Sequence, residues 1–125
     1  MALFKNLGWV SYNVTDWQKA KKFYGETLSL PVAWFQDDKT GWMEFGEKEG
    51  THIAISQWQG PGPVPPREGG AIAIFEVDDI SKAVAELRKR GVKCEDVQVV
   101  PGMVAYATFF DPEGNRLQVA GAPPG

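Results

Sequence analysis

The sequence consists of two copies of one pattern, which together occupy nearly all of its 125 residues. The segment FGEKEGTHIAI at Phe45–Ile55 returns as FFDPEGNRLQV at Phe109–Val119, an offset of 64 residues. Upstream, WVSYNVTDW at Trp9–Trp17 matches IAIFEVDDI at Ile72–Ile80, at an offset of 63. A repeat of this length indicates one supersecondary unit used twice, each copy burying its apolar face with help from the other.

Each copy predicts the order strand, helix, strand, strand, strand. The opening strands alternate, with Val10, Tyr12 and Val14 on one face of the first. Helices are expected directly after Asp16 and Asp79, because a carboxylate can accept hydrogen bonds from the free amides of a first helical turn. Gly91 should end the second helix in a left-handed conformation. The remaining strands are expected at Val32–Gln36, Gly41–Phe45, Thr51–Trp58, Val92–Val100, Met103–Phe110 and Asn115–Ala120, with turns at Asp37–Thr40 and Pro101-Gly102.

Three segments resemble the vicinal oxygen chelate superfamily, which includes glyoxalases, bleomycin-resistance proteins and extradiol dioxygenases. They are VSYNVTDWQKAKKFYGETLSL, GGAIAIFEVDDISKAVAELRKRGV and FFDPEGNRLQV, the last being the most specific. The resemblance implies an α+β protein whose two tandem βαβββ modules form an incomplete eight-stranded barrel around a cavity. We expect a single domain with modules at about 5–58 and 71–121, joined by a linker at 59–70. The resemblance also implies a homodimer, in which modules pair within one chain or exchange between two.

Composition excludes several classes of function. No run of about 18 apolar residues exists, and no secretion signal is visible, so we expect neither a membrane partner nor export. Cys94 is the only cysteine and fits a reducing cytoplasm. The formal net charge is −3, and the densest basic cluster is Arg88-Lys89-Arg90, which disfavours nucleic acid as a partner.

The resemblance also locates where a metal ion would be held. Superfamily enzymes usually place His, Glu or Gln ligands on the first and last strands of each module. At the matching positions this chain has Trp9, Ala54, Ile72 and Gln118, of which Gln118 alone offers an oxygen. A divalent cation needs anionic or imidazole ligands, so we predict no metal and no other cofactor. A displaced metal site or metal-free acid–base catalysis would use His52, Glu44 and Glu76.

Strand alternation predicts which side chains face the cavity. They form an aromatic and apolar surface with a few polar groups, a mixture typical of small-molecule sites. Trp17 is expected in the core under the first helix, and Trp34 is a second candidate for the core. The Pro- and Gly-rich segment Gln57–Gly70 is expected to be a linker, and it could instead form a flap that brings Trp58 and Arg67 to the ligand. The predicted ligand-binding residues are Trp9, Ser11, Asn13, Trp42, Glu44, His52, Ser56, Trp58, Ile72, Ile74, Tyr106, Arg116 and Gln118.

Three functions fit these features. The first is a metal-free protein that sequesters an aromatic or cationic small molecule, since aromatic walls and a net negative charge suit such a guest. The second is a lyase, isomerase or dioxygenase of the glyoxalase type. The third is an accessory subunit with a vestigial cavity. Metal content separates the metal-dependent enzyme from the rest, and stabilisation by a ligand separates the first function from the third.

Overall fold

The structure, a computed structural model, describes residues 7–64 and 71–124. The chain divides into two compact units, Met1–Val64 and Pro65–Gly125. In the first unit, β1 (Trp9–Val14) is followed by α1 (Trp17–Lys22), a π-helical turn η1 (Phe23–Thr27), β2 (Val32–Phe35), β3 (Trp42–Phe45) and β4 (His52–Gln57). The second contains β5 (Ala73–Glu76), α2 (Ile80–Lys89), β6 (Gln98–Val100), β7 (Val104–Phe110) and β8 (Arg116–Gly121).

Both units have the same sheet topology. The strand orders are β1-β4-β3-β2 and β5-β8-β7-β6, and in each sheet the first pair is parallel and the other two pairs are antiparallel. The prediction of an α+β protein built from two βαβββ modules is therefore confirmed. Within the described residues the two sheets are hydrogen-bonded separately, so the eight strands do not close into one barrel.

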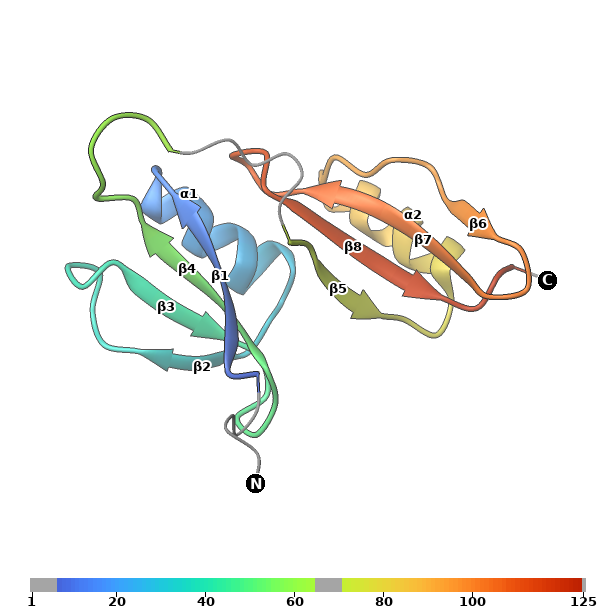
Figure 1. The fold of residues 1–125 in the computed structure, drawn as a ribbon, viewed down its shortest axis with the longest axis horizontal. Coiled ribbons are helices and arrows are strands. Elements are labelled where there is room, and N and C mark those ends of the chain that lie inside the picture. The colour runs from blue at the N-terminus through green and yellow to red at the C-terminus, as the bar shows by residue number, and fades with distance from the viewer. Residues whose placement is uncertain (1–6, 65–70, 125) are drawn as a thin grey trace, which may run out of the picture. The chain divides into compact units, whose positions relative to one another are not determined.

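In each unit the helix covers one face of its own sheet and leaves the other face open (Figure 1). The covered face carries the buried apolar side chains, as the alternation predicts. In the first unit the rings of Tyr24 and Phe45 stack with centroids 5.9 Å apart, and both residues are almost fully buried. Phe109 and Leu117 occupy the same kind of position in the second unit. Burying one such side chain stabilises the fold by about 1.5–3 kcal/mol.

The helices start alike and end differently. Asp16 accepts a hydrogen bond from the Lys19 amide at 3.2 Å, and Asp79 accepts one from Lys82 at 3.0 Å, which confirms both predicted caps. Gly91, with φ of 81°, follows the end of α2 in the predicted left-handed conformation. The first helix instead widens into η1, which the sequence did not predict. No helix in the described segments is long and apolar enough to span a membrane.

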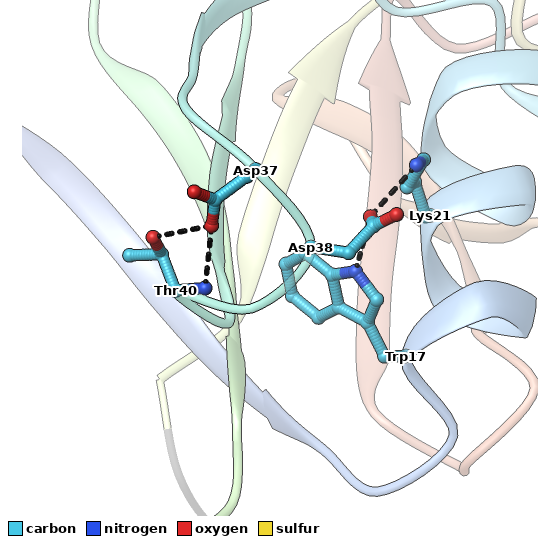
Figure 2. A network of polar contacts seen from close by, with 5 residues as sticks. All are labelled: Trp17, Lys21, Asp37, Asp38 and Thr40. Atoms are coloured by element: carbon cyan, nitrogen blue, oxygen red, sulfur yellow. Dashed lines mark hydrogen bonds and ion pairs between the residues drawn. The ribbon is translucent and has the colours of Figure 1, made fainter.

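The prediction that Trp17 lies in the core is wrong. Trp17 is only partly buried, and its indole nitrogen donates to Asp38 Oδ1 at 2.8 Å, from the turn before β3 (Figure 2). Lys21 Nζ binds the same oxygen at 2.8 Å, and this contact, together with the Trp17 bond, lowers the pKa of Asp38. Asp37 closes the turn by accepting from the backbone amide and hydroxyl of Thr40. The turn is therefore attached to α1.

The predicted strand at Val92–Val100 is also shorter than expected. Only Gln98–Val100 forms β6, and the preceding residues contribute a single isolated bridge between Cys94 and Phe109. Burial raises the pKa of the Cys94 thiol, which disfavours the reactive thiolate. Cys94 is therefore better explained as a small structural residue than as a nucleophile.

Candidate ligand-binding site

Strand register brings most of the predicted residues of the first unit onto the open face of its sheet. Trp9 is the partner of His52 across β1 and β4, and Ser11 is the partner of Ala54. Paired residues on neighbouring strands point to the same side of a sheet. The other members of this face are Asn13, Ser56, Trp42 and Glu44, placed by the pairs Asn13–Ser56, Trp42–Ser56 and Glu44–Ala54.

Two indole rings meet across the middle of this open face. The centroids of Trp9 and Trp42 lie 6.1 Å apart, with the rings nearly perpendicular at 79°. The two residues come from β1 and β3, which flank β4, and the β4 residue between them is Ala54, which is fully buried. We infer that the small Ala54 side chain is what allows the rings to meet. Trp9 is still 54% exposed, so much of its ring surface is available to a ligand.

A hydrogen-bonded network joins the indole pair to the histidine. Glu44 Oε2 accepts from the Trp42 indole nitrogen at 2.9 Å, and Glu44 Oε1 lies 2.8 Å from His52 Nδ1. His52 Nε2 lies 2.9 Å from the backbone carbonyl oxygen of Glu47. The side chains of Glu44 and His52 are each only 15% exposed. The sequence named His52, Glu44 and Glu76 as one candidate group, and the structure brings Glu44 and His52 into direct contact, whereas Glu76 lies in the second unit.

This geometry favours a charged pair. The hydrogen bond to Glu44 raises the pKa of His52 above its ordinary value; burial opposes this rise and the Glu47 carbonyl contributes to it. Burial alone would raise the pKa of Glu44, but the hydrogen bonds from Trp42 and His52 outweigh it and leave that pKa lowered. Both shifts favour the carboxylate of Glu44 and the imidazolium of His52 over their neutral forms.

A pocket of about 570 Å³ opens beside this network, within the first unit. Trp9, Glu44 and His52 form one part of its wall, and Leu7 with Gly8 and the turn Lys48–Thr51 complete it. A pocket of this size suits a small organic ligand, for which typical sites range from roughly 300 to 1,000 Å³.

Trp34 lies outside the core, for which it was a second candidate, and Trp58 lies beside the linker. Trp34 is the partner of Glu44 across β2 and β3, so it belongs to the open face and is 44% exposed. An irregularity between Val32 and Trp34 changes the strand phase there, which simple alternation cannot reveal. Trp58 follows the end of β4 and donates from its indole nitrogen to the Gly62 carbonyl at 2.9 Å. Trp58 thus packs against the linker, and Arg67 lies outside the described residues.

The open face of the second unit has a different character. Gln118 pairs with Ile74 and Thr108, and its amide nitrogen donates to the Thr108 hydroxyl at 3.1 Å. Tyr106 lies two residues from Thr108 along β7, and Ile74 is 56% exposed. The other predicted residues of this unit lie at strand ends: Ile72 just before β5, Glu76 at the exposed end of β5, and Arg116 at the start of β8. A single cavity lined by both units stays a prediction.

The residues present do not fit the metal centre of the superfamily enzymes. On the first sheet the two matching positions carry an indole and a methyl group, and on the second unit they carry Ile72 and Gln118. Gln118 is already bonded to Thr108. Within residues 7–64 and 71–124, no three His, Cys, Asp or Glu residues gather closely enough to hold a metal ion. The Glu44–His52 pair therefore offers two ligating groups without a third.

Comparisons with known proteins agree with the fold. The model of the Glyoxalase/Bleomycin resistance protein/Dioxygenase superfamily matches residues 6–119. The chain is 26% identical to YraH of Bacillus subtilis (strain 168), over 85% of this chain and 90% of that one. It superposes on the crystal structure of TnmS3, an antibiotic binding protein from Streptomyces sp. CB03234, with a TM-score of 0.80 and 26% identity, covering 98% and 100% of the two chains. The crystal structure of a glyoxalase/bleomycin resistance protein from the same Streptomyces superposes with a TM-score of 0.71 and 28% identity, covering 91% of this chain and 98% of that one.

Proposed function

Because this chain belongs to the glyoxalase/bleomycin resistance protein/dioxygenase superfamily, we propose that it is a metal-free protein that binds and sequesters an aromatic small molecule. The observation that carries this proposal is the indole of Trp9, which lines a 570 Å³ pocket and meets Trp42 across the sheet. Superfamily membership alone does not define the activity, because one fold hosts many functions.

The chemistry of the open face supports binding over catalysis. A partly exposed indole provides a flat apolar surface for a ring, while Glu44 and backbone groups beside it can fix the orientation of the guest. His52 has both ring nitrogens engaged, so it offers no free nitrogen to act as a base. The likeness to TnmS3, which binds an antibiotic, points in the same direction. A glyoxalase-type activity remains the alternative that metal content and turnover assays would reveal.

Tryptophan fluorescence tests this proposal directly. The purified protein is titrated with planar dyes and with aromatic antibiotics, including glycopeptides, since a ring stacked on indole should quench its emission. Trp9→Ala and Trp42→Ala should each weaken binding by about two- to tenfold, because ring stacking contributes roughly 0.5–1.5 kcal/mol beyond burial.

A matched control uses a tryptophan outside the site. Trp17 lies at the start of α1, on the side bonded to Asp38, so Trp17→Phe should leave the affinity unchanged. The absence of any quenching or thermal stabilisation across the compound set would remove the proposal. Equal binding to all four proteins would show that a pocket exists elsewhere in the molecule.

A further inference from the structure

His52, the only histidine of the chain, contacts two groups that can only accept hydrogen bonds. One is the Glu44 carboxylate at 2.8 Å from Nδ1, and the other is the Glu47 backbone carbonyl at 2.9 Å from Nε2. A neutral imidazole carries a single N–H, whereas the imidazolium carries two. Both contacts can therefore be hydrogen bonds only while His52 is protonated.

The charged groups at the pocket balance one another in that state. Glu44 from β3 is opposed by His52 from β4, and in the turn between these strands Lys48 stands beside Glu49 on the pocket wall. The neighbours from β1 and β2, Trp9 and Trp34, are neutral. Loss of the proton from His52 leaves the pocket with one net negative charge.

Loss of the proton also removes one hydrogen bond. The neutral ring can keep its bond to Glu44 or its bond to the Glu47 carbonyl, and the other oxygen then faces a nitrogen lone pair. Either Glu44 Oε1 becomes available to a ligand, or the turn that carries Lys48 and Glu49 loses the hydrogen bond between its Glu47 carbonyl and His52. Both results change the pocket wall beside Trp9.

We propose that the Glu44–His52 pair determines which charge of aromatic ligand the pocket accepts, with uncharged ligands tolerated in both protonation states and cationic ligands favoured once His52 is neutral. This inference rests on the proposed function and adds to it a class of ligand. The stacking surface of Trp9 is the same for both ligand types, and the net charge next to it distinguishes them. A cationic ligand that lies close both to the indole face and to an uncompensated carboxylate is attracted by each of them.

Two planar probes of similar shape test the proposal, namely 9-aminoacridine, which is cationic, and acridone, which is neutral. Their affinities are measured by isothermal titration calorimetry between about pH 6 and about pH 9, on either side of the range where a histidine with a raised pKa titrates. We expect 9-aminoacridine to bind at least about threefold more tightly at the higher pH, since one fully linked proton gives up to about tenfold per pH unit. Acridone should change little.

Two variants isolate the role of the histidine. His52→Gln keeps a donor for Glu44 but cannot titrate, so its affinity for 9-aminoacridine should be high and independent of pH. Glu47→Gln leaves the backbone carbonyl that His52 contacts in place, so it should keep the wild-type pH dependence. Equal pH dependence in wild type and His52→Gln would overturn the inference while leaving the proposed function intact. Failure of both probes to bind at any pH would overturn the proposed function, and the inference with it.

A measurement without ligand tests the protonation state independently. Because the chain has one histidine, long-range ¹H–¹⁵N correlation spectra give the two ring nitrogens without overlap. Near neutral pH both should have the shifts of protonated nitrogens, and in Glu44→Gln the transition to the neutral ring should move to lower pH. A neutral ring at neutral pH in the wild type would refute the inference.

Discussion

The two units share the face of the sheet that packs on the helix and differ on the face that is open. At the repeat offset of 64, Phe45 corresponds to Phe109, and both are about 1% exposed. On the open face the first unit has an indole, a carboxylate and an imidazole where the second has a phenol, a hydroxyl and a guanidinium. The corresponding pairs are Trp42 and Tyr106, Glu44 and Thr108, His52 and Arg116, and Ala54 and Gln118.

This difference separates what the fold requires from what a ligand requires. The covered faces need large apolar side chains in both units, because each helix must bury one side of its sheet. The open faces have no such constraint. Among the described residues, only the first combines an indole pair with a pocket that is lined by Trp9, Glu44 and His52. The proposed recognition of a ligand therefore rests mainly on the first unit.

The largest expected effect tests the shared face. Phe45→Ala and Phe109→Ala should each lower the free energy of unfolding by roughly 3–5 kcal/mol, because each removes a large, fully buried ring. Urea denaturation followed by circular dichroism measures both. Phe35→Ala, on a partly exposed side chain, serves as the control with a smaller loss. A large loss for one phenylalanine alone would show that the two cores are not equivalent.

The second-largest expected effect on stability distinguishes two turns that are closed by the same kind of backbone hydrogen bond. Gly50 donates to the Glu47 carbonyl, and Gly114 donates to that of Asp111. The buried Asp111 carboxylate also accepts from the Glu113 amide and from both nitrogens of Asn115, at 2.7–2.9 Å, whereas Glu47 is exposed.

Asp111→Ala should therefore lower the free energy of unfolding by about 1.5–3 kcal/mol, the range for hydrogen bonds to charged groups. Glu47→Ala should change it by less than about 0.5 kcal/mol, as is usual for an exposed side chain. Chemical denaturation of the two variants side by side makes the comparison. Equal losses would mean that the side-chain caps of the two turns do not differ in strength.

The smallest effect is the dependence of stability on pH. The pKa of His52 is raised in the folded protein, so His52 contributes fully to the free energy of unfolding below the pKa that it has in the unfolded chain. This contribution is lost as the pH rises through the pKa of His52 in the folded protein. The pKa of Glu44 is lowered in the folded protein, so Glu44 contributes to the free energy of unfolding above the pKa that it has in the unfolded chain. This contribution is lost as the pH falls through the pKa of Glu44 in the folded protein. The melting temperature should decline as the pH passes the His52 pKa, and His52→Gln should remove this decline. A decline of equal size in the variant would assign it to other groups.

The repeat and the strand alternation were sufficient to predict much of this molecule. Two βαβββ modules, the helix caps at Asp16 and Asp79, and the face on which Trp9, Trp42 and Glu44 lie all follow from local patterns. Apolar side chains at period two can bury themselves against a helix in only one phase. That is why the predicted phase of β1, β3 and β4 carries over to the structure.

Features that depend on tertiary contacts could not be predicted. The irregularity before Trp34 reverses the phase of one strand end, and Trp17 bonds to Asp38, which is 21 residues away. The contact between Glu44 and His52 depends on the register of β3 against β4, which the sequence does not state. The sequence feature that pointed to this contact was the placement of Glu44 and His52 on one predicted face, because a carboxylate and an imidazole on neighbouring strands can reach each other.

The assignment of ligand recognition to the open face of the first unit is tested most directly through its indole signals. All five tryptophans lie in the described residues, and each gives one indole ¹H–¹⁵N signal that can be assigned by substitution. Titration with 9-aminoacridine should move the signals of Trp9 and Trp42 in a saturable way and leave that of Trp17 in place. Saturable shifts confined to Trp17, or no shifts at any indole while the compound binds, would contradict the account.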